Sequence, residues 1–193
     1  MPNRKCAEWY ILFSGFLQQA STQNGMERIF WDVCELVKAR PARVELRRWC
    51  DNTEELAEWI SRSIPEDSET RIVVMGYSWG GMAAKHFADE LRKRGHTIDE
   101  MILSDPVYRH WCWCGNWLAF LSGLPIRISD NVKRVRHFAQ RENYPRGHPV
   151  VANNPGKTIV EDVSWLSMNH VHMDDAWGFR QACLEAAKGE VIS

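Results

Sequence analysis

A serine set between two glycines, directly after an apolar run, is the feature that most restricts how this chain folds. Apolar residues 72–75 lead into the sequence GYSWG (residues 76–80), and a helix-patterned stretch continues to Gly95. A side chain at position 76 or 80 would collide with the backbone as a strand reverses into a helix, so glycine is favoured at both. The pattern predicts a buried strand, a sharp turn and a helix, with Ser78 at the turn.

The predicted turn makes Ser78 a candidate nucleophile. Its oxygen would be held out from the sheet by a strained backbone conformation. A helix N-terminus also presents backbone N–H groups and the positive end of the helix dipole, which favour developing negative charge. The simpler interpretation is a serine that only caps the helix.

Strands and helices alternate along the rest of the sequence. Strand-like runs fall near residues 8–14, 43–49, 70–77, 99–104, 132–139 and 158–165, with helical patterns between most of them. A last helical pattern runs from about Asp174 to Lys188 and ends at Gly189, a residue suited to a helix C-cap. Such alternation predicts an α/β fold with a mostly parallel central sheet and helices on both of its faces.

The composition is that of one globular domain without a strong charge. With 193 residues and 45% hydrophobic content, we expect residues 1–193 to form a single domain. The 24 Lys and Arg residues balance 25 Asp and Glu residues, which gives no electrostatic basis for binding nucleic acid. No nucleic-acid partner is therefore predicted.

We expect a soluble protein of the cytosol. Arg4 and Lys5 precede an apolar run, but Glu8 interrupts it and no small-residue cleavage site follows, so this segment is predicted to be the first strand rather than a signal peptide. No apolar stretch approaches the ~18 residues that cross a bilayer, so no integral membrane association is expected. The six scattered cysteines indicate reduced thiols and a cytoplasmic location.

Polar residues at the predicted strand ends supply partners for Ser78. The carboxyl ends of parallel strands form the crevice in which α/β proteins bind ligands. Asp105 follows the fourth strand and His170 follows the last, so serine, acid and histidine occur in that order. A serine nucleophile needs a base and a carboxylate that orients the base. We predict His170 as the base and Asp105 as the carboxylate.

Other residues compete for these two roles. His172 lies two residues after His170 and is the second candidate for the base. Glu142, after the fifth strand, is the second candidate for the acid, and Asp162 is the third because it falls within the predicted last strand. The simpler interpretation of Asp105 is a turn residue before a proline.

Two backbone N–H groups are expected to form an oxyanion hole. A loop at residues 14–17 follows the first strand, which would place the N–H of Phe16 opposite that of Trp79. One such donor is worth ~10²–10³ in rate. A glycine after a strand is also an ordinary turn, so this assignment depends on Ser78.

No metal site and no organic cofactor are predicted. His110, Cys112 and Cys114 are close in sequence, but C-x-C lacks the usual spacing of zinc ligands and no second cysteine pair is nearby. The stretch HVHMDD (residues 170–175) is similar to the H-x-H-x-D segment of binuclear zinc hydrolases. Such a site needs further histidine ligands, and no histidine follows this stretch.

Residues 108–125 are a candidate cap over the crevice. Trp111, Trp113 and Trp117 fall in this interval and would suit a pocket or lid for an acyl group. An equally good interpretation is that these tryptophans cover the sheet as part of the core.

A basic run follows the candidate cap. Residues 127–146 hold six Lys and Arg residues against two acidic ones. Such a run would face a phosphate-bearing acyl carrier, or it would form a solvated edge strand that is protected from pairing with other chains.

Four segments of the sequence carry a resemblance to a known superfamily. They are FSGF (13–16), GYSWGG (76–81), SDPV (104–107) and the stretch from Asn169 to Asp175. Together they resemble the α/β-hydrolases, and among these the small lipase-like and thioesterase-like serine hydrolases of bacteria and their phages. The resemblance implies a compact α/β-hydrolase fold with a short cap after the fourth strand, Ser78, Asp105 and His170 as triad, and an acyl-enzyme. The family's more frequent acid position, after the next strand, holds no clear aspartate, which keeps Glu142 as an alternative.

The expected function is that of a serine hydrolase cleaving a carboxylic ester or thioester of a small acyl substrate. Two other functions fit the same residues. The first is a non-catalytic protein on a hydrolase scaffold that binds acyl ligands or regulates, since fold does not dictate function. The second is acyl transfer or amide cleavage by the same nucleophile.

Overall fold

The computed structural model describes residues 7–16, 18, 23–64, 69–109 and 123–189. The elements in chain order are β1 (Ala7–Ser14), α1 (Gly25–Val37), β2 (Ala42–Arg48), α2 (Thr53–Ser63), β3 (Thr70–Tyr77), α3 (Trp79–Lys93), β4 (Ile98–Ser104), β5 (Ile126–Ile128), β6 (Val132–Gln140), β7 (Val150–Ala152), β8 (Ile159–Val160), β9 (Ser164–Leu166), the 3₁₀ turn η1 (His170–His172) and α5 (Trp177–Lys188).

A seven-stranded sheet forms the centre of the described structure. Its strand order is β2-β1-β3-β4-β6-β8, and β9 also pairs with β6. Each of these strand pairs is parallel. The predicted α/β fold with a mostly parallel central sheet is therefore confirmed.

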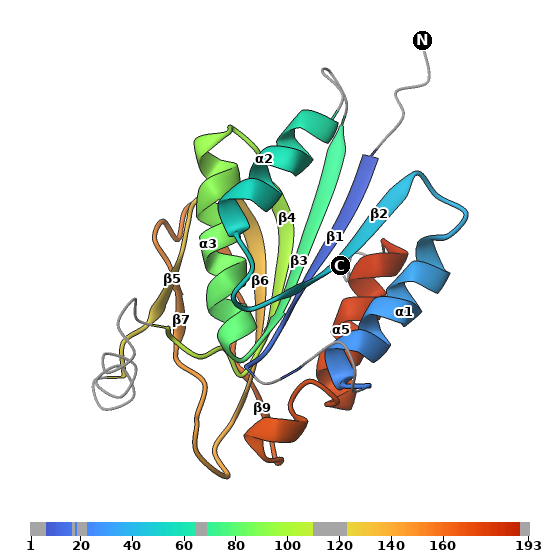
Figure 1. Ribbon diagram of the computed structural model, residues 1–193. Helices are drawn as coiled ribbons and strands as arrows, with labels where there is room; N and C mark the ends of the chain where they lie inside the picture. The colour runs from blue at the N-terminus through green and yellow to red at the C-terminus, as the bar shows by residue number, and fades with distance from the viewer. Residues whose placement is uncertain (1–6, 17, 19–22, 65–68, 110–122, 190–193) are drawn as a thin grey trace.

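Helices cover both faces of this sheet (Figure 1). Successive residues of β1 point to opposite faces, as in any strand. Leu12 packs in a core with helices α1 and α5, whereas Phe13 packs in a second core with α2 and α3. Burial on both faces explains why the middle strands are continuous apolar runs rather than alternating ones.

The sheet reverses its direction of growth between β1 and β3. The chain passes from β1 to β2 on one side, then crosses back to β3 on the other side and continues outward to β4 and β6. In open α/β sheets, ligands bind at such a switch point, outside the carboxyl ends of the strands. The loop after β1 and the turn after β3 both lie there.

Helices α1 and α2 each have one apolar stripe and an asparagine side chain that caps the N-terminus. In α1, Met26, Ile29 and Val33 are buried at helical spacing, and the side chain of Asn24 accepts a hydrogen bond from the backbone N–H of Glu27 at 3.0 Å. Such helices stay at the surface of the sheet. Among the described residues, no helix combines the length and apolarity needed to cross a bilayer.

The C-terminal third departs from the predicted elements. A single last strand was expected over residues 158–165, but the chain forms two short strands, β8 and β9, with exposed Asp162 between them. The last helix begins at Trp177 rather than near Asp174, because η1 and the turns after it occupy the preceding residues. Gly189 ends this helix with φ 80°, as the C-cap prediction required.

Residues 143–156 contain a short strand, β7. Strand β7 pairs in parallel with β5 to form a separate two-stranded sheet. His148 and Val150 are buried there. Neither β5 nor β7 was among the strands predicted from the sequence.

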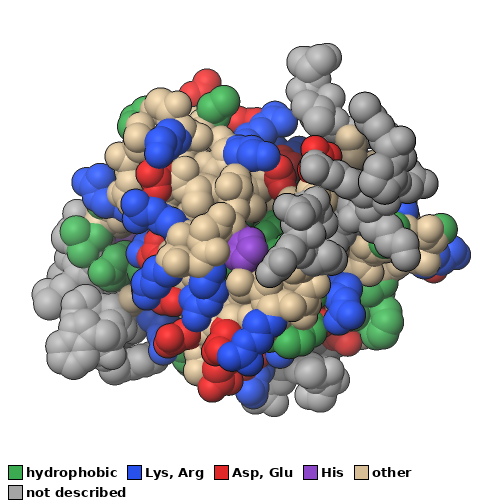
Figure 2. Space-filling model, turned by 90° about the horizontal axis from the view of Figure 1, so that it is seen from above, with side chains coloured by type: hydrophobic (Ala, Val, Ile, Leu, Met, Phe, Trp, Pro, Cys, Tyr) green, Lys and Arg blue, Asp and Glu red, His purple; other side chains and the backbone are tan. Residues whose placement is uncertain are grey.

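The central part of the basic run lies on an inner strand, where its side chains pair with acidic ones. Its central part is β6, which lies between β4 and the pair β8 and β9, so the edge-strand interpretation was wrong. Lys133 pairs with Asp99 at 2.6 Å, and buried Arg136 pairs with Glu100 at 2.6 Å and Glu185 at 2.8 Å. Figure 2, which looks onto the end of the molecule where the strands begin, shows acidic and basic side chains interspersed there.

Gly80 lies where helix α3 packs closely against strand β1. A Cβ on Gly80 would lie 2.2 Å from the carbonyl oxygen of Phe13, which real contacts do not allow. Gly178 holds the same second position in α5, and a Cβ there would meet the Phe138 ring at an ordinary 3.5 Å. We expect Gly80→Ala to lower the free energy of unfolding by roughly 1–3 kcal/mol or more, and Gly178→Ala to leave it unchanged or raise it by up to about 1 kcal/mol.

Urea unfolding of both variants measures this difference. Equal effects of the two substitutions would contradict the proposed contact between α3 and β1.

Candidate active site

The turn between β3 and α3 holds Ser78 in an unusual backbone conformation. Its φ is 54° and its ψ is −125°, a region that a residue with a Cβ rarely occupies. The backbone N–H of Ser78 donates to the carbonyl of Ser104 at 3.0 Å, and its carbonyl accepts from the N–H groups of Gly81 and Val107, both at 2.9 Å. A Cβ on Gly76 would lie 2.8 Å from the carbonyl oxygen of Gly80, so the turn needs glycine here.

The structure brings Ser78, His170 and Asp105 together in one hydrogen-bonded line. The Ser78 Oγ lies 2.9 Å from His170 Nε2, and His170 Nδ1 lies 2.6 Å from Asp105 Oδ2. Asp105 is fully buried, and Ser78 and His170 are each 5% exposed. Since a carboxylate can only accept, the Nδ1 atom carries the proton and Nε2 is free to accept one from Ser78.

Backbone contacts fix the segment that carries His170. The hydroxyl of Tyr77, the residue before the serine, donates to the carbonyl of His170 at 2.7 Å. The N–H of His170 donates to the side-chain oxygen of Asn143 at 2.8 Å. Farther along, the hydroxyl of Ser104 donates to the carbonyl of Met173 at 2.7 Å. The imidazole therefore stands on a backbone held from three directions.

The carboxylate of Asp105 is enclosed by donors. Its backbone has φ 43°, and its N–H donates to the carbonyl of Phe138 at 2.7 Å. Its side chain accepts from the N–H of Gly147 at 2.9 Å, from the N–H of Gln140 at 3.3 Å and from the Gln140 Nε2 at 3.0 Å. These donors hold the carboxylate group in one orientation.

The competing candidates lie elsewhere. His172, Glu142 and Asp162 are all exposed. Glu142 contributes only its backbone N–H nearby, which donates to Gln140 Oε1 at 2.7 Å. In the described ranges, no hydrogen bond joins any of these three side chains to Ser78 or His170.

The loop after β1 lies against the serine turn, where an oxyanion hole was predicted. A Cβ on Gly15 would lie 3.1 Å from the Ser78 Cβ. The N–H of Gly15 itself donates to the side chain of Gln18 at 2.8 Å. Trp79 is the first residue of α3 and contributes the N–H that follows the serine.

A buried carboxylate ties this loop to the segment of His170. Gln18 Nε2 donates to Asp174 Oδ2 at 2.5 Å, and the N–H of Gly25 donates to the same oxygen at 2.8 Å. Burial raises the pKa of Asp174 above its usual value, and the charge of Asp175 adds to the shift. The Gln18 and Asp174 contacts depend on tertiary approach, and nothing in the sequence marked them.

An aromatic cluster surrounds the start of α3. The rings of Phe16 and Trp79 have centroids 4.5 Å apart, those of Trp49 and Trp79 4.8 Å, and those of Phe16 and Trp49 5.5 Å. The guanidinium of Arg109 stacks over Trp49 at 4.5 Å. Trp49 was not among the predicted site residues, because its proximity to Trp79 arises only when β2 and β3 flank β1.

Part of the predicted site cannot be placed. Trp111, Trp113 and Trp117, the predicted acyl pocket, and the cap that contains them lie outside the described residues, as do His110, Cys112 and Cys114. Within the described ranges, no group of three or more His, Cys, Asp and Glu side chains has the arrangement of a metal site.

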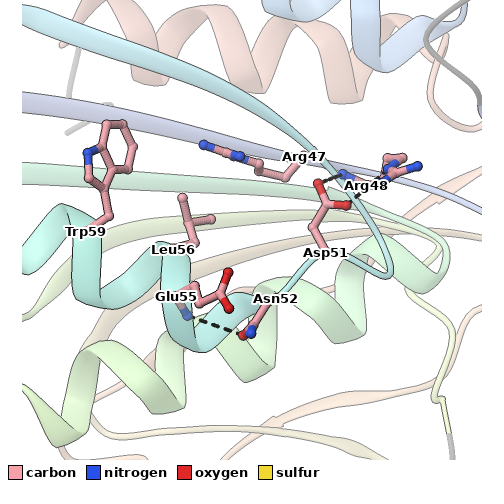
Figure 3. A pocket seen from close by; sticks show the side chains of 7 residues that line it. All are labelled: Arg47, Arg48, Asp51, Asn52, Glu55, Leu56 and Trp59. Carbon is pink, nitrogen blue, oxygen red and sulfur yellow. Dashed lines mark hydrogen bonds and ion pairs between the residues drawn. The ribbon is translucent and has the colours of Figure 1, made fainter.

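A separate open pocket of about 450 Å³ lies beside β2 and α2. Its lining residues are Arg47, Arg48, Asp51, Asn52, Glu55, Leu56 and Trp59 (Figure 3). Arg48 pairs with Asp51 at 3.0 Å and Arg47 with Glu45 at 2.8 Å. The pocket contains none of the residues around Ser78, and its charges are balanced internally.

Solved structures similar to this one include two that cover nearly the whole chain. The first is a protein from Lactobacillus plantarum WCFS1, provisionally assigned as a cell surface hydrolase, with a TM-score of 0.50 and 13% identity over 99% of this chain and 94% of that chain. The second is a cutinase-like protein from Cryptococcus sp., with a TM-score of 0.49 and 11% identity over 96% of this chain and 97% of that chain. At such identities the likeness concerns the fold alone. No protein-family model matches the sequence, and no curated protein matches it significantly.

His137 is a buried histidine near Asp105. It is not part of the hydrogen-bonded line formed by Ser78, His170 and Asp105. It pairs with Leu103 across β4 and β6, and neither of its ring nitrogens has a hydrogen-bond partner in the described structure. Burial lowers the pKa of His137 from 6.5 to about 4, an effect that the charge of Asp105 only partly opposes. The folded protein therefore holds this imidazole neutral.

The low pKa of His137 predicts a loss of stability in acid. The unfolded chain takes up a proton near pH 6.5, whereas the folded chain resists it down to about pH 4, so stability declines as pH falls between these values. By pH 5 the loss from this group reaches roughly 2 kcal/mol. We expect His137→Leu to remove most of that dependence, as measured by urea unfolding at pH 5 and pH 7.

The exposed His172 provides the matched control. His172→Gln should keep the wild-type dependence on pH. An unchanged dependence in His137→Leu would show that other groups cause the acid sensitivity.

Proposed function

We propose that this protein is a serine hydrolase that cleaves carboxylic esters or thioesters through an acyl-enzyme on Ser78. One observation carries the proposal, namely the line from Ser78 Oγ through His170 to Asp105 with contacts of 2.9 and 2.6 Å. It lies at the switch point of the sheet, where α/β proteins bind ligands. The shared fold with a protein assigned to the hydrolases is consistent with it.

In the first half-reaction, Ser78 Oγ attacks the carbonyl carbon of the substrate. His170 Nε2 takes the hydroxyl proton as the new C–O bond forms, and Asp105 stabilises the resulting imidazolium through Nδ1–H. The carbonyl π electrons move to oxygen, and we assign the N–H groups of Phe16 and Trp79 to bind the oxyanion. The tetrahedral intermediate then collapses, and His170 Nε2 gives its proton to the leaving alcohol or thiol.

The second half-reaction releases the acid. Water replaces the leaving group, His170 Nε2 removes one of its protons, and the oxygen attacks the acyl carbon. Collapse of this second intermediate returns the proton to Ser78 Oγ and frees a carboxylic acid. Each step uses side chains and backbone groups of this chain, so the proposed mechanism requires neither a metal nor an organic cofactor.

Covalent labelling by a fluorophosphonate tests the nucleophile. We expect the wild-type protein to be labelled and Ser78→Ala to be inert, with turnover of p-nitrophenyl esters lowered by roughly 10⁴-fold or more because the three residues act as a unit. The exposed Ser164, on β9, offers a control, since Ser164→Ala should be labelled like the wild type.

Two outcomes would redirect the proposal. Labelling that persists in Ser78→Ala would assign the reaction to another residue. If the wild-type protein is not labelled by the fluorophosphonate but binds acyl ligands, it is a binding protein on this scaffold. Parallel assays with acyl-CoA thioesters, and with competing alcohols as acceptors, separate thioester cleavage and acyl transfer from ester hydrolysis.

A further inference from the structure

Gln140, the last residue of β6, contacts the acid directly. It is 2% exposed, and its Nε2 donates to Asp105 Oδ2 at 3.0 Å. The same carboxylate oxygen lies 2.6 Å from His170 Nδ1. The amide therefore shares this oxygen with the base and restricts rotation of the carboxylate about its Cβ–Cγ bond.

The other end of the Gln140 amide organises the loop that follows β6. Its Oε1 accepts from the backbone N–H groups of Glu142 at 2.7 Å and Asn143 at 3.0 Å. Its Nε2 also lies within donating distance of the carbonyls of Asn143 at 2.9 Å and Pro145 at 3.0 Å. One buried side chain thus fixes the path of this loop while it holds the carboxylate.

The loop in turn holds the base. The side-chain oxygen of Asn143 accepts from the backbone N–H of His170 at 2.8 Å. The contacts therefore close a ring that runs from Asp105 through Gln140 and Asn143 to the His170 backbone, and back through the imidazole to Asp105.

We infer that Gln140 is a positioning residue for the proposed reaction. It fixes the position of the Asp105 carboxylate relative to the backbone of His170. The inference rests on the proposed function. The positioning role requires a side chain of this length that has both a donor and an acceptor. Glutamine provides both, whereas an ionised glutamate has no donor. Reactions of this kind lose rate steeply when reacting groups are displaced by as little as 1 Å.

Gln140→Glu is the sharpest variant, because it keeps the shape and replaces a donor by a second carboxylate beside Asp105. We expect kcat for p-nitrophenyl esters to fall about tenfold or more, with KM within about twofold of the wild type. The acid limb of the kcat/KM profile should move up by about one pH unit, because added negative charge favours protonation of His170.

The shift in the acid limb separates this role from a merely structural one. Loss of packing alone lowers the amount of active protein without changing the pH at which the base titrates. Gln181→Glu, on α5, makes the same change in charge at a distance from Ser78 and should keep the wild-type profile. Tyr77, Ser78 and Asp105 face His170, and His137 lies near the same carboxylate, so all four stay unchanged in both variants.

Asn143 supplies a second test that does not depend on the folding of Gln140→Glu. Asn143→Ala removes the acceptor for the His170 N–H and should lower kcat about tenfold, whereas Asn143→Asp keeps an oxygen there and should restore most of it. Circular dichroism verifies that each variant is folded.

The outcomes distinguish the two proposals. A wild-type protein with no esterase or thioesterase turnover overturns the proposed function and this inference with it. An active wild type, together with a folded Gln140→Glu variant of unchanged kcat and acid limb, overturns the inference alone. If Gln140→Glu does not fold, equal activity of Asn143→Ala and the wild type overturns it.

Discussion

The backbone conformation of Ser78 is the constraint on which the site depends. A positive φ at a residue with a Cβ costs on the order of 1–3 kcal/mol and persists only where the surroundings enforce it. Here the enforcing contacts are the hydrogen bonds from Ser78 to Ser104 and from Val107 to Ser78. Both partners flank Asp105 in the sequence, so Ser78 and Asp105 are positioned by one shared backbone network rather than by two independent loops.

His170 is held in place differently. His170 comes from a short 3₁₀ turn that has little structure of its own, and its position is set by partners on other elements, among them Tyr77 and Asn143. With the backbone held in this way, the Nε2 edge of the imidazole faces the Oγ of Ser78. The site therefore combines Ser78 and Asp105, which follow adjacent strands, with His170, whose main chain is hydrogen-bonded to side chains of other segments.

The parts that could be predicted from the sequence were those governed by local sterics and strand order. Glycine spacing around Ser78 required the turn, and the rule that parallel strands end at one edge placed Asp105 and His170 beside it. The contacts of Gln140 could not be predicted, because they depend on where β6 ends against its neighbours and on the path of the next loop. The division of the last strand into β8 and β9 could not be predicted either, because the pattern of apolar residues does not indicate where the pairing with β6 is interrupted.

The tether between Asp174 and the N-terminal loops has a consequence for synthesis of the chain. Asp174 bonds to Gln18 and to the N–H of Gly25, across 156 and 149 residues, and His170 meets Ser78 across 92. Helix α5, which completes one layer over the sheet, follows both. Contacts of such range form late, because the loops they close are long. A growing chain that already contains the strand, turn and helix around Ser78 therefore still lacks His170 and the Asp174 contacts that hold its segment in place.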